Sequence, residues 1–191
     1  MSSGTIEVLD PVADVTIEAR TVADRLDSLV GKRVGYHHAR GPYLTVLAFA
    51  EKLGELLTEK YGISEIVRLK SIVDNGASGW SDPRLPEITK RVYDEYATQV
   101  DCVIVGAAFC GGSTYWSLQA AAEFNDRGIP TVSLASNAFA DLATYSAQNR
   151  GYLTLPMLIL PDDFETKRPH EMHSLAEAHV DETVTLLSRD K

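Results

Sequence analysis

Hydrophobic residues follow two alternating patterns from residue 31 onward. Short runs that we interpret as strands occur at 32–37, 63–69, 101–107, 131–135 and 155–160, and the third of them is the most continuously apolar. The segments that follow these runs place apolar residues three or four positions apart, as amphipathic helices do. We expect helices at 42–62, 86–96, 139–148 and 170–188, and one that is capped by Ser113 or Thr114 and extends to Asn125. The pattern therefore predicts five strand–helix units.

Strands that alternate with helices indicate a parallel sheet, because a connection between parallel strands has to cross over the sheet. We therefore expect an α/β protein built as a three-layer sandwich, with a five-stranded, mostly parallel sheet between layers of helices. A flavodoxin-like strand order, 2-1-3-4-5, is the expected topology. Residues 31–191 should form a single α/β domain. Residues 1–30, which lack a regular period, should form an N-terminal arm that wraps around the domain or a partner.

The composition mainly limits the kinds of partner that the protein surface can bind. The 191 residues carry a formal net charge of −9, whereas nonspecific binding of nucleic acid requires a basic surface. No apolar run approaches the roughly 18 residues that span a bilayer, and residues 1–30 lack the layout of a secretory signal. We therefore expect a cytoplasmic protein that binds a small-molecule substrate and has no nucleic-acid or membrane partner.

Two cysteines occupy opposite ends of the third apolar run. In an extended strand Cys102 and Cys110 would lie roughly 25 Å apart, which is too far for a disulfide. We interpret Cys102 as a buried structural residue. Cys110 follows the strand and precedes a helix, a position where ligands bind in open α/β sheets and where a helix N-terminus favours a thiolate. Cys110 is therefore the candidate catalytic residue, and a tight turn around an inert cysteine is the alternative.

The four residues after Cys110 are suited to binding negative charge. Gly111 and Gly112 leave backbone amides accessible, and Ser113 and Thr114 add hydroxyl groups. Together these residues can form an anion or oxyanion site beside a thiolate. The segment does not match the glycine patterns GxGxxG or GxxxxGK[ST]. It therefore predicts a substrate-binding turn and not a dinucleotide or triphosphate loop.

Two further loops at the same predicted sheet edge carry polar side chains. His37 and His38 end the first apolar run, and either histidine can act as an acid or base toward the thiol. Arg40 can hold a carboxylate through its paired donors. Ser136 and Asn137 follow the fourth run and can donate hydrogen bonds to substrate oxygen atoms. The alternatives are a solvated loop for the first group and a helix cap for Asn137.

The sequence implies no cofactor and no metal. His170 and His173 flank Glu171 at a spacing that superficially suggests a metal site. The H-E-x-x-H spacing and paired cysteine ligands that would support such a site do not occur. We interpret these histidines as part of a solvated first helical turn, where a glutamate is favourable.

The sequence also resembles a known family. The segment 106–117, GAAFCGGSTYWS, resembles the motif of the UGSC proteins, in which selenocysteine or cysteine is followed by Gly-Ser-Cys-Thr and then by Trp-Ser. The resemblance extends to 8–11, 25–35 and 127–132 and therefore spans most of the chain. It implies a similarity to selenoprotein B of glycine reductase, in which a selenolate attacks the carbon that bears an activated amine.

The chain departs from the UGSC motif around the thiol. Cys110 stands at the selenocysteine position, Ser113 replaces the second thiol, and Phe109 stands where the family commonly has an acidic residue. The resemblance therefore implies a single thiolate that acts as a nucleophile or acid–base group, and not a two-thiol redox cycle. A weaker similarity is to the aspartate/glutamate racemase superfamily, whose thiolates carry protons in racemisation, isomerisation or decarboxylation. Since this chain has one such motif, that similarity implies at most one-cysteine chemistry.

These observations support a leading hypothesis and an alternative. The leading hypothesis is a cysteine-dependent enzyme that acts on a small polar substrate bearing a carboxylate or an amine. Its Cys110 thiolate would perform nucleophilic C–X bond chemistry, addition–elimination or isomerisation. The alternative is a non-catalytic or carrier subunit in a complex with a related UGSC-like protein. We expect a homo-oligomer or a hetero-oligomer, and the substrate, the reaction type and the choice between His37 and His38 are left open.

Overall fold

The computed structural model describes residues 16–38, 44–70, 72–79, 81–108 and 110–189. At its centre is a sheet of five strands, β1 (Arg33–His37), β2 (Glu65–Leu69), β3 (Cys102–Ala108), β4 (Thr131–Ser136) and β5 (Met157–Leu160). Their order across the sheet is β2-β1-β3-β4-β5, and every neighbouring pair is parallel. The predicted α/β fold with its flavodoxin-like strand order is confirmed.

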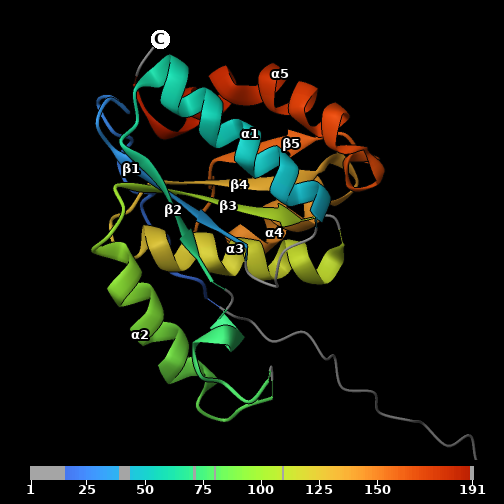
Figure 1. Cartoon of the computed structure of the whole chain (residues 1–191). Coiled ribbons are helices and arrows are strands. Elements are labelled where there is room, and N and C mark those ends of the chain that lie inside the picture. The colour runs from blue at the N-terminus through green and yellow to red at the C-terminus, as the bar shows by residue number, and fades with distance from the viewer. Residues whose placement is uncertain (1–15, 39–43, 71, 80, 109, 190–191) are drawn as a thin grey trace, which may run out of the picture.

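Helices cover both faces of this sheet. One face is covered by α1 (Leu44–Tyr61) and α5 (Pro169–Leu187), and the other by α2 (Leu85–Ala97), α3 (Gly111–Asn125) and α4 (Ala140–Gln148) (Figure 1). Three short 3₁₀ helices follow β2, β4 and β5, namely η1 (Ile72–Asn75), η2 (Asn137–Phe139) and η3 (Phe164–Thr166). Of the helices described, none combines the length and the apolar character needed to cross a bilayer. The predicted three-layer sandwich is confirmed.

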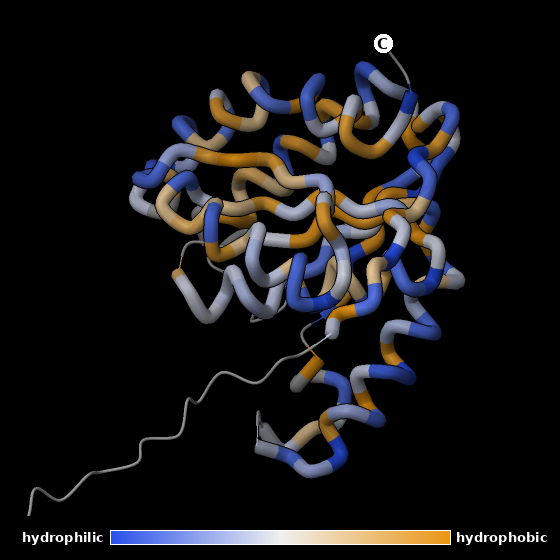
Figure 2. Tube along the Cα trace, turned by 180° about the vertical axis from the view of Figure 1, so that it is seen from behind, coloured by the Kyte–Doolittle hydropathy of each residue, from blue (hydrophilic) through white to orange (hydrophobic). Residues whose placement is uncertain are grey.

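The central strands β3 and β4 are buried on both faces, because successive side chains of a strand point to opposite sides and helices cover each side. In β3, Cys102 and Ile104 pack into the cluster beneath α1 and α5, while Val103 and Val105 pack into the cluster beneath α2, α3 and α4. Figure 2 shows hydrophobic residues concentrated in the central layer, with hydrophilic residues more frequent on the surrounding helices. This burial of both faces explains why β3, with the sequence CVIVGAA, is a continuous apolar run.

The structure corrects the predicted start of the third helix. α3 begins at Gly111, and its N-cap is Cys110, which has extended backbone angles of φ −138° and ψ 160°. Neither Ser113 nor Thr114 is the cap. Ser113 lies at the third helical position, where its hydroxyl accepts the Cys110 N–H at 3.1 Å, and the two residues form a capping box. The predicted start of the first helix, at Pro42, lies outside the described residues.

The described part of the N-terminal arm, residues 16–30, is hydrogen-bonded to distant parts of the chain. The Arg20 N–H donates to the Gly151 carbonyl at 2.8 Å, and the Leu26 N–H donates to the last residue of α5 at 3.0 Å. Gly151 has φ +87°, and a Cβ atom at this position would collide with the Glu18 carbonyl oxygen. This glycine therefore allows the arm to approach the segment after α4 more closely than another residue would.

Candidate functional site

Cys110 is exposed and follows the carboxyl end of β3. The Ser113 backbone N–H donates to its Sγ atom at 3.4 Å. The sulfur therefore accepts one of the amides at the start of α3 that have no partner within the helix. Since the amino end of a helix carries partial positive charge, this position favours the anionic form of a side chain. The structure thus places the predicted catalytic thiol at the expected edge of the sheet.

The Ser113 hydroxyl lies close to three groups of Cys110. It is 3.2 Å from Sγ and 3.1 Å from the backbone N–H that it accepts, and it donates to the carbonyl oxygen at 3.0 Å. A hydroxyl carries one proton, so it can donate to either the carbonyl or the sulfur. If it turns to the sulfur, the carbonyl keeps the Thr114 hydroxyl and the Thr114 N–H, each at 2.9 Å. Ionisation of the thiol would therefore gain a second hydrogen bond without leaving the carbonyl unpaired.

Apolar side chains of η2 and α4, which we call the apolar wall, lie beside the start of α3. A Cβ atom on Gly111 would lie 3.5 Å from Leu142 of α4 and 3.9 Å from Phe139 of η2. Ala108 of β3 is paired with Ala135 of β4, so the loop after β4 belongs to the same edge as the thiol. The sequence did not predict the apolar wall, because aromatic and aliphatic residues near the start of a helix do not indicate a functional site.

Ser136 and Asn137 occupy this loop after β4. Ser136 is 2% exposed, whereas Asn137 is exposed in η2. The N-cap of α4 is Phe139, so the alternative interpretation of Asn137 as the cap of that helix is wrong. Of the two predicted donors, Asn137 is therefore the one whose side chain is accessible to a ligand.

His37 is buried in the layer between the sheet and α2. Its Nε2 atom is 3.0 Å from the Tyr93 hydroxyl, and its ring makes edge contacts with Tyr93 and Phe124 at centroid distances of 5.5 and 6.1 Å. Burial lowers the pKa of His37 to about 3, and the nearby His38 contributes to this shift. The imidazole is therefore neutral near pH 7 and packs as a core side chain.

The structure does not bring His37 to the thiol. His37 is paired with Val105 in the sheet, five residues before Cys110. At ~3.3 Å per residue, the backbone at Val105 is roughly 16 Å from that at Cys110 along the strand. The His37 ring also contacts Phe124, which lies at the opposite end of α3 from Cys110. A direct proton transfer between His37 and Cys110 is therefore not supported by this arrangement.

His38 is the nearer of the two histidines to the carboxyl edge of the sheet, because it follows the last residue of β1. It is 7% exposed, and burial lowers its pKa to about 4. The alternative of a solvated loop is therefore wrong for both histidines. Arg40, the predicted carboxylate ligand, lies outside the described residues, and its role stays a prediction.

Cys102, His170 and His173 have surroundings that account for them without a catalytic role. Cys102 is fully buried, which raises the pKa of its thiol to about 12 and leaves it inert, as expected. His170 and His173 are exposed at the start of α5, where the Glu171 carboxylate accepts the Arg168 N–H at 2.8 Å. This arrangement confirms the solvated first turn. Within the described ranges, no three or more His, Cys, Asp or Glu side chains are placed to hold a metal ion.

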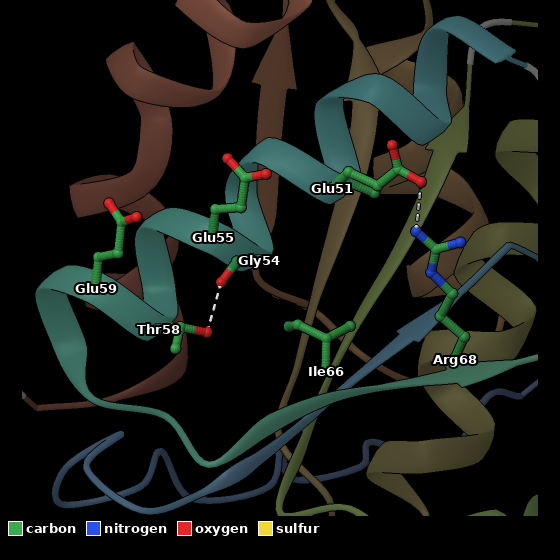
Figure 3. A pocket seen from close by; sticks show the side chains of 8 residues that line it. Glu51, Gly54, Glu55, Thr58, Glu59, Ile66 and Arg68 are labelled. Atoms are coloured by element: carbon green, nitrogen blue, oxygen red, sulfur yellow. Dashed lines mark hydrogen bonds and ion pairs between the residues drawn. The ribbon is translucent and has the colours of Figure 1, made fainter.

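A groove of about 740 Å³ lies between α1 and the edge strand β2 (Figure 3). Glu51, Glu55 and Glu59 line it from the helix, and Arg68 on the strand donates to Glu51 at 3.0 Å. Ile66 packs closely against α1 at the floor of the groove. β1 separates this strand from β3, and neither a cysteine nor a histidine is among the residues that line the groove. We therefore place the candidate site at Cys110 and not here.

The fold and the site define an α/β protein with an exposed cysteine at the N-cap of the helix that follows its central strand. The family model of the UGSC family matches residues 7–189, and the chain belongs to this family. The resemblance noted in the sequence is thereby confirmed. The weaker similarity to the aspartate/glutamate racemase superfamily stays a hypothesis.

Comparison with solved structures finds FerB, a flavoenzyme NAD(P)H:(acceptor) oxidoreductase from Paracoccus denitrificans. The two chains are 18% identical, with a TM-score of 0.43 over 82% of this chain and 97% of FerB. No curated protein matches this chain.

Ser113→Cys is expected to create a pair of thiols that oxidises readily. The Ser113 hydroxyl is 3.2 Å from the Cys110 sulfur, so a small side-chain rotation would bring two sulfurs to bonding distance. After mild oxidation with diamide, intact mass should fall by about 2 Da, and both thiols should resist alkylation. Ser117→Cys, whose side chain is about two helical turns from Cys110, should keep its free thiols. If Ser113→Cys also kept both thiols, the side chain at 113 would not face the sulfur as described.

Proposed function

We propose that this protein is an enzyme in which the Cys110 thiolate acts on a small polar molecule that bears a carboxylate or an amine. The observation that carries the proposal is the hydrogen bonding of the sulfur. An exposed Sγ atom accepts an amide of the first helical turn and has a hydroxyl 3.2 Å away. Thiols in such surroundings ionise more readily than free cysteine, and the thiolate is the nucleophile.

The predicted binding residues divide into two groups by their contacts. The Ser113 amide and hydroxyl interact with the sulfur, so Ser113 supports the nucleophile. The Thr114 hydroxyl is bonded to the Cys110 carbonyl and therefore orders the turn. The amides of Gly111 and Gly112 open the helix and have no acceptor in a preceding turn. We assign to these two amides the stabilisation of negative charge that develops on the substrate.

The remaining roles are assigned by position in the structure, except that of Arg40, which is assigned from the sequence alone. Asn137 would donate to a substrate oxygen, and Arg40 would hold a substrate carboxylate. Ser136 is buried and would order the loop that carries Asn137. His38 is the preferred acid–base group because it lies closer to the edge than His37, and burial keeps its imidazole neutral near pH 7.

The reaction class that fits a single thiolate is nucleophilic C–X bond chemistry, addition–elimination or isomerisation. When the thiolate attacks a substrate carbon, a C–S bond would form as the C–X bond breaks, which gives a transient thioether or thioester. The group X would leave with the electron pair of the C–X bond, and the negative charge that develops would lie at the amino end of α3. We propose that the reaction needs no cofactor and takes place in the cytoplasm. The alternative function is a non-catalytic or carrier subunit of a related UGSC-like protein, favoured by the replacement of the second motif thiol by Ser113.

The rate of Cys110 alkylation by iodoacetamide, measured from pH 5 to 9 with intact mass, tests the proposed thiolate. We expect a midpoint well below the ~8.5 of a free thiol. Ser113→Ala should raise this midpoint by about one unit, because it removes a hydrogen bond to the charged form. Buried Cys102 should stay unmodified and serves as the internal reference.

Cys110→Ser is the control for this experiment, and it should abolish modification of the folded protein. A midpoint at or above the free-thiol value, or no reaction at all, would contradict an activated Cys110. The subunit function would then be favoured. A stable adduct on Cys110 in protein purified from its host would instead indicate a carrier.

A further inference from the structure

Large hydrophobic side chains that are exposed gather on one part of the described surface. Four of them lie on two neighbouring helices: Tyr115 (44% exposed) and Trp116 (36%) on α3, and Leu142 (37%) and Tyr145 (63%) on α4. We call these four residues the α3–α4 face. Single exposed apolar residues are normal on a protein, but a group of four that includes three aromatics is not.

Two contacts place α3 beside α4 and the residues that follow α4. Leu142 approaches Gly111 near the amino ends of both helices, and Arg150 donates to Gln119 at 3.0 Å further along. Both contacts follow the order of the chain, so the two helices lie side by side and run in the same direction. Tyr145 lies between these two contacts and so comes level with the middle of α3.

The aromatic residues of α3 occupy that same level. Tyr115 and Trp116 lie between the two contacts along α3, and their rings meet edge to face at a centroid distance of 5.4 Å. Leu142 and Tyr145 are three residues apart and share one side of α4. The four side chains thus cover adjacent parts of two parallel helices.

The α3–α4 face is almost free of charge on a strongly acidic chain. The formal net charge of the protein is −9. Residues 111–122 of α3 contain no Asp, Glu, Lys or Arg, and residues 140–149, which span α4, contain Asp141 alone. Two copies of this protein would repel each other over most of their surfaces but not here. Glu123 and Arg150 line a pocket with Tyr115 and Trp116, but these two side chains already form an ion pair with each other at 3.0 Å. A partner of opposite charge would therefore find few groups with which to pair.

Exposed aromatic side chains with few charged residues among them are typical of the core of a symmetric protein interface. Interface cores are depleted in charged residues and enriched in tyrosine and tryptophan. In a two-fold dimer the same patch meets itself, so any charge within it would face a like charge across the axis. An uncharged aromatic patch meets this requirement. We propose that the α3–α4 face is a dimer interface and that its partner is a second copy of this chain.

Dimerisation would also place a second chain beside the thiol, because Cys110 is the N-cap of α3. The interface is nevertheless argued from exposure and charge alone. It does not depend on whether Cys110 is reactive.

Sedimentation velocity of the full chain from 1 to 50 µM tests the interface. The wild-type protein should sediment as a species of twice the 20.9 kDa chain mass. Tyr145→Arg should weaken association by about 100-fold or more, because two like charges would be buried across the axis. Val30→Arg is the matched control: Val30 is 69% exposed but outside the α3–α4 face, so this variant should remain a dimer.

A monomeric wild-type protein at 50 µM would overturn the proposal. So would a Tyr145→Arg or Tyr115→Glu variant that keeps the wild-type circular dichroism spectrum and still dimerises. Both positions are exposed, so each variant should fold, and two variants guard against an unfolded one. Monomeric variants with native spectra, together with a dimeric Val30→Arg variant, would support the proposal.

Discussion

Gly106→Ala is expected to lower the free energy of unfolding by about 3 kcal/mol, as for an overpacked core. Gly106 lies within β3, and a Cβ atom there would be 2.5 Å from Cβ and 2.8 Å from Cγ of Leu134 on β4. Leu134 is fully buried beneath α1 and α5, so it has no space into which to move. The neighbouring strands would have to separate locally, at the point where β3 leads to Cys110.

Urea unfolding at pH 7.5 measures this loss, and the melting temperature should fall by about 6–12 °C. Gly111→Ala is the matched control, since its Cβ would be 3.5 Å from Leu142, an ordinary contact, and alanine suits a helix better than glycine. We expect the control to stay within about 1 kcal/mol of wild type. Equal stabilities of the two variants would show that β3 and β4 do not pack as closely as described at Gly106.

Acidification from pH 7.5 to 5.0 is expected to destabilise the fold through its two buried histidines. Burial lowers the pKa of His37 to about 3 and that of His38 to about 4, whereas an unfolded histidine titrates near 6.5. Between these values the unfolded chain binds protons that the folded chain does not, so stability falls as the pH falls. The loss by pH 5.0 is about 2 kcal/mol for each histidine, from 1.5 pH units at 1.36 kcal/mol per unit.

His37→Phe separates the contribution of one histidine. Phenylalanine keeps an aromatic ring against Phe124 but leaves the Tyr93 hydroxyl without its partner, so this variant should be less stable at pH 7.5. Its further loss between pH 7.5 and 5.0 should be about half that of wild type. His173→Ala, at an exposed position, should retain the full pH dependence. A wild-type stability that does not change over this pH range would show that the histidines are accessible to protons when folded.

The strand and helix pattern was predictable because it depends on local spacing. Val103 and Val105 face one layer of helices while Ile104 faces the other, so the sequence around them is apolar throughout and identifies a strand buried on both faces. The edge at which Cys110 lies follows from the same pattern, since parallel strands place their carboxyl ends together. The exact start of α3 did not follow, because cysteine is not a usual N-cap and Ser113 and Thr114 are.

The direction of polar side chains was not predictable. The sequence places His37 one residue from His38 and at the same sheet edge as the thiol. In the structure its ring turns toward Tyr93 and Phe124, because alternate residues of β1 point to opposite faces of the sheet. Which face a residue meets depends on helices that are more than 50 positions away along the chain.

The sequence alone therefore determined the class of fold, the family motif and the position of Cys110 after a buried strand, because each depends on residues that are close together in the chain. The tertiary structure decided which groups act together. It placed the Ser113 hydroxyl and amide at the sulfur, withdrew His37 into the core and set Leu142 beside the first turn of α3. The contacts of His37 and Leu142 join separate elements, and their geometry is fixed only when the helices pack on the sheet. The contacts of Ser113 are local to the first turn of α3, and they depend on the cap position of Cys110.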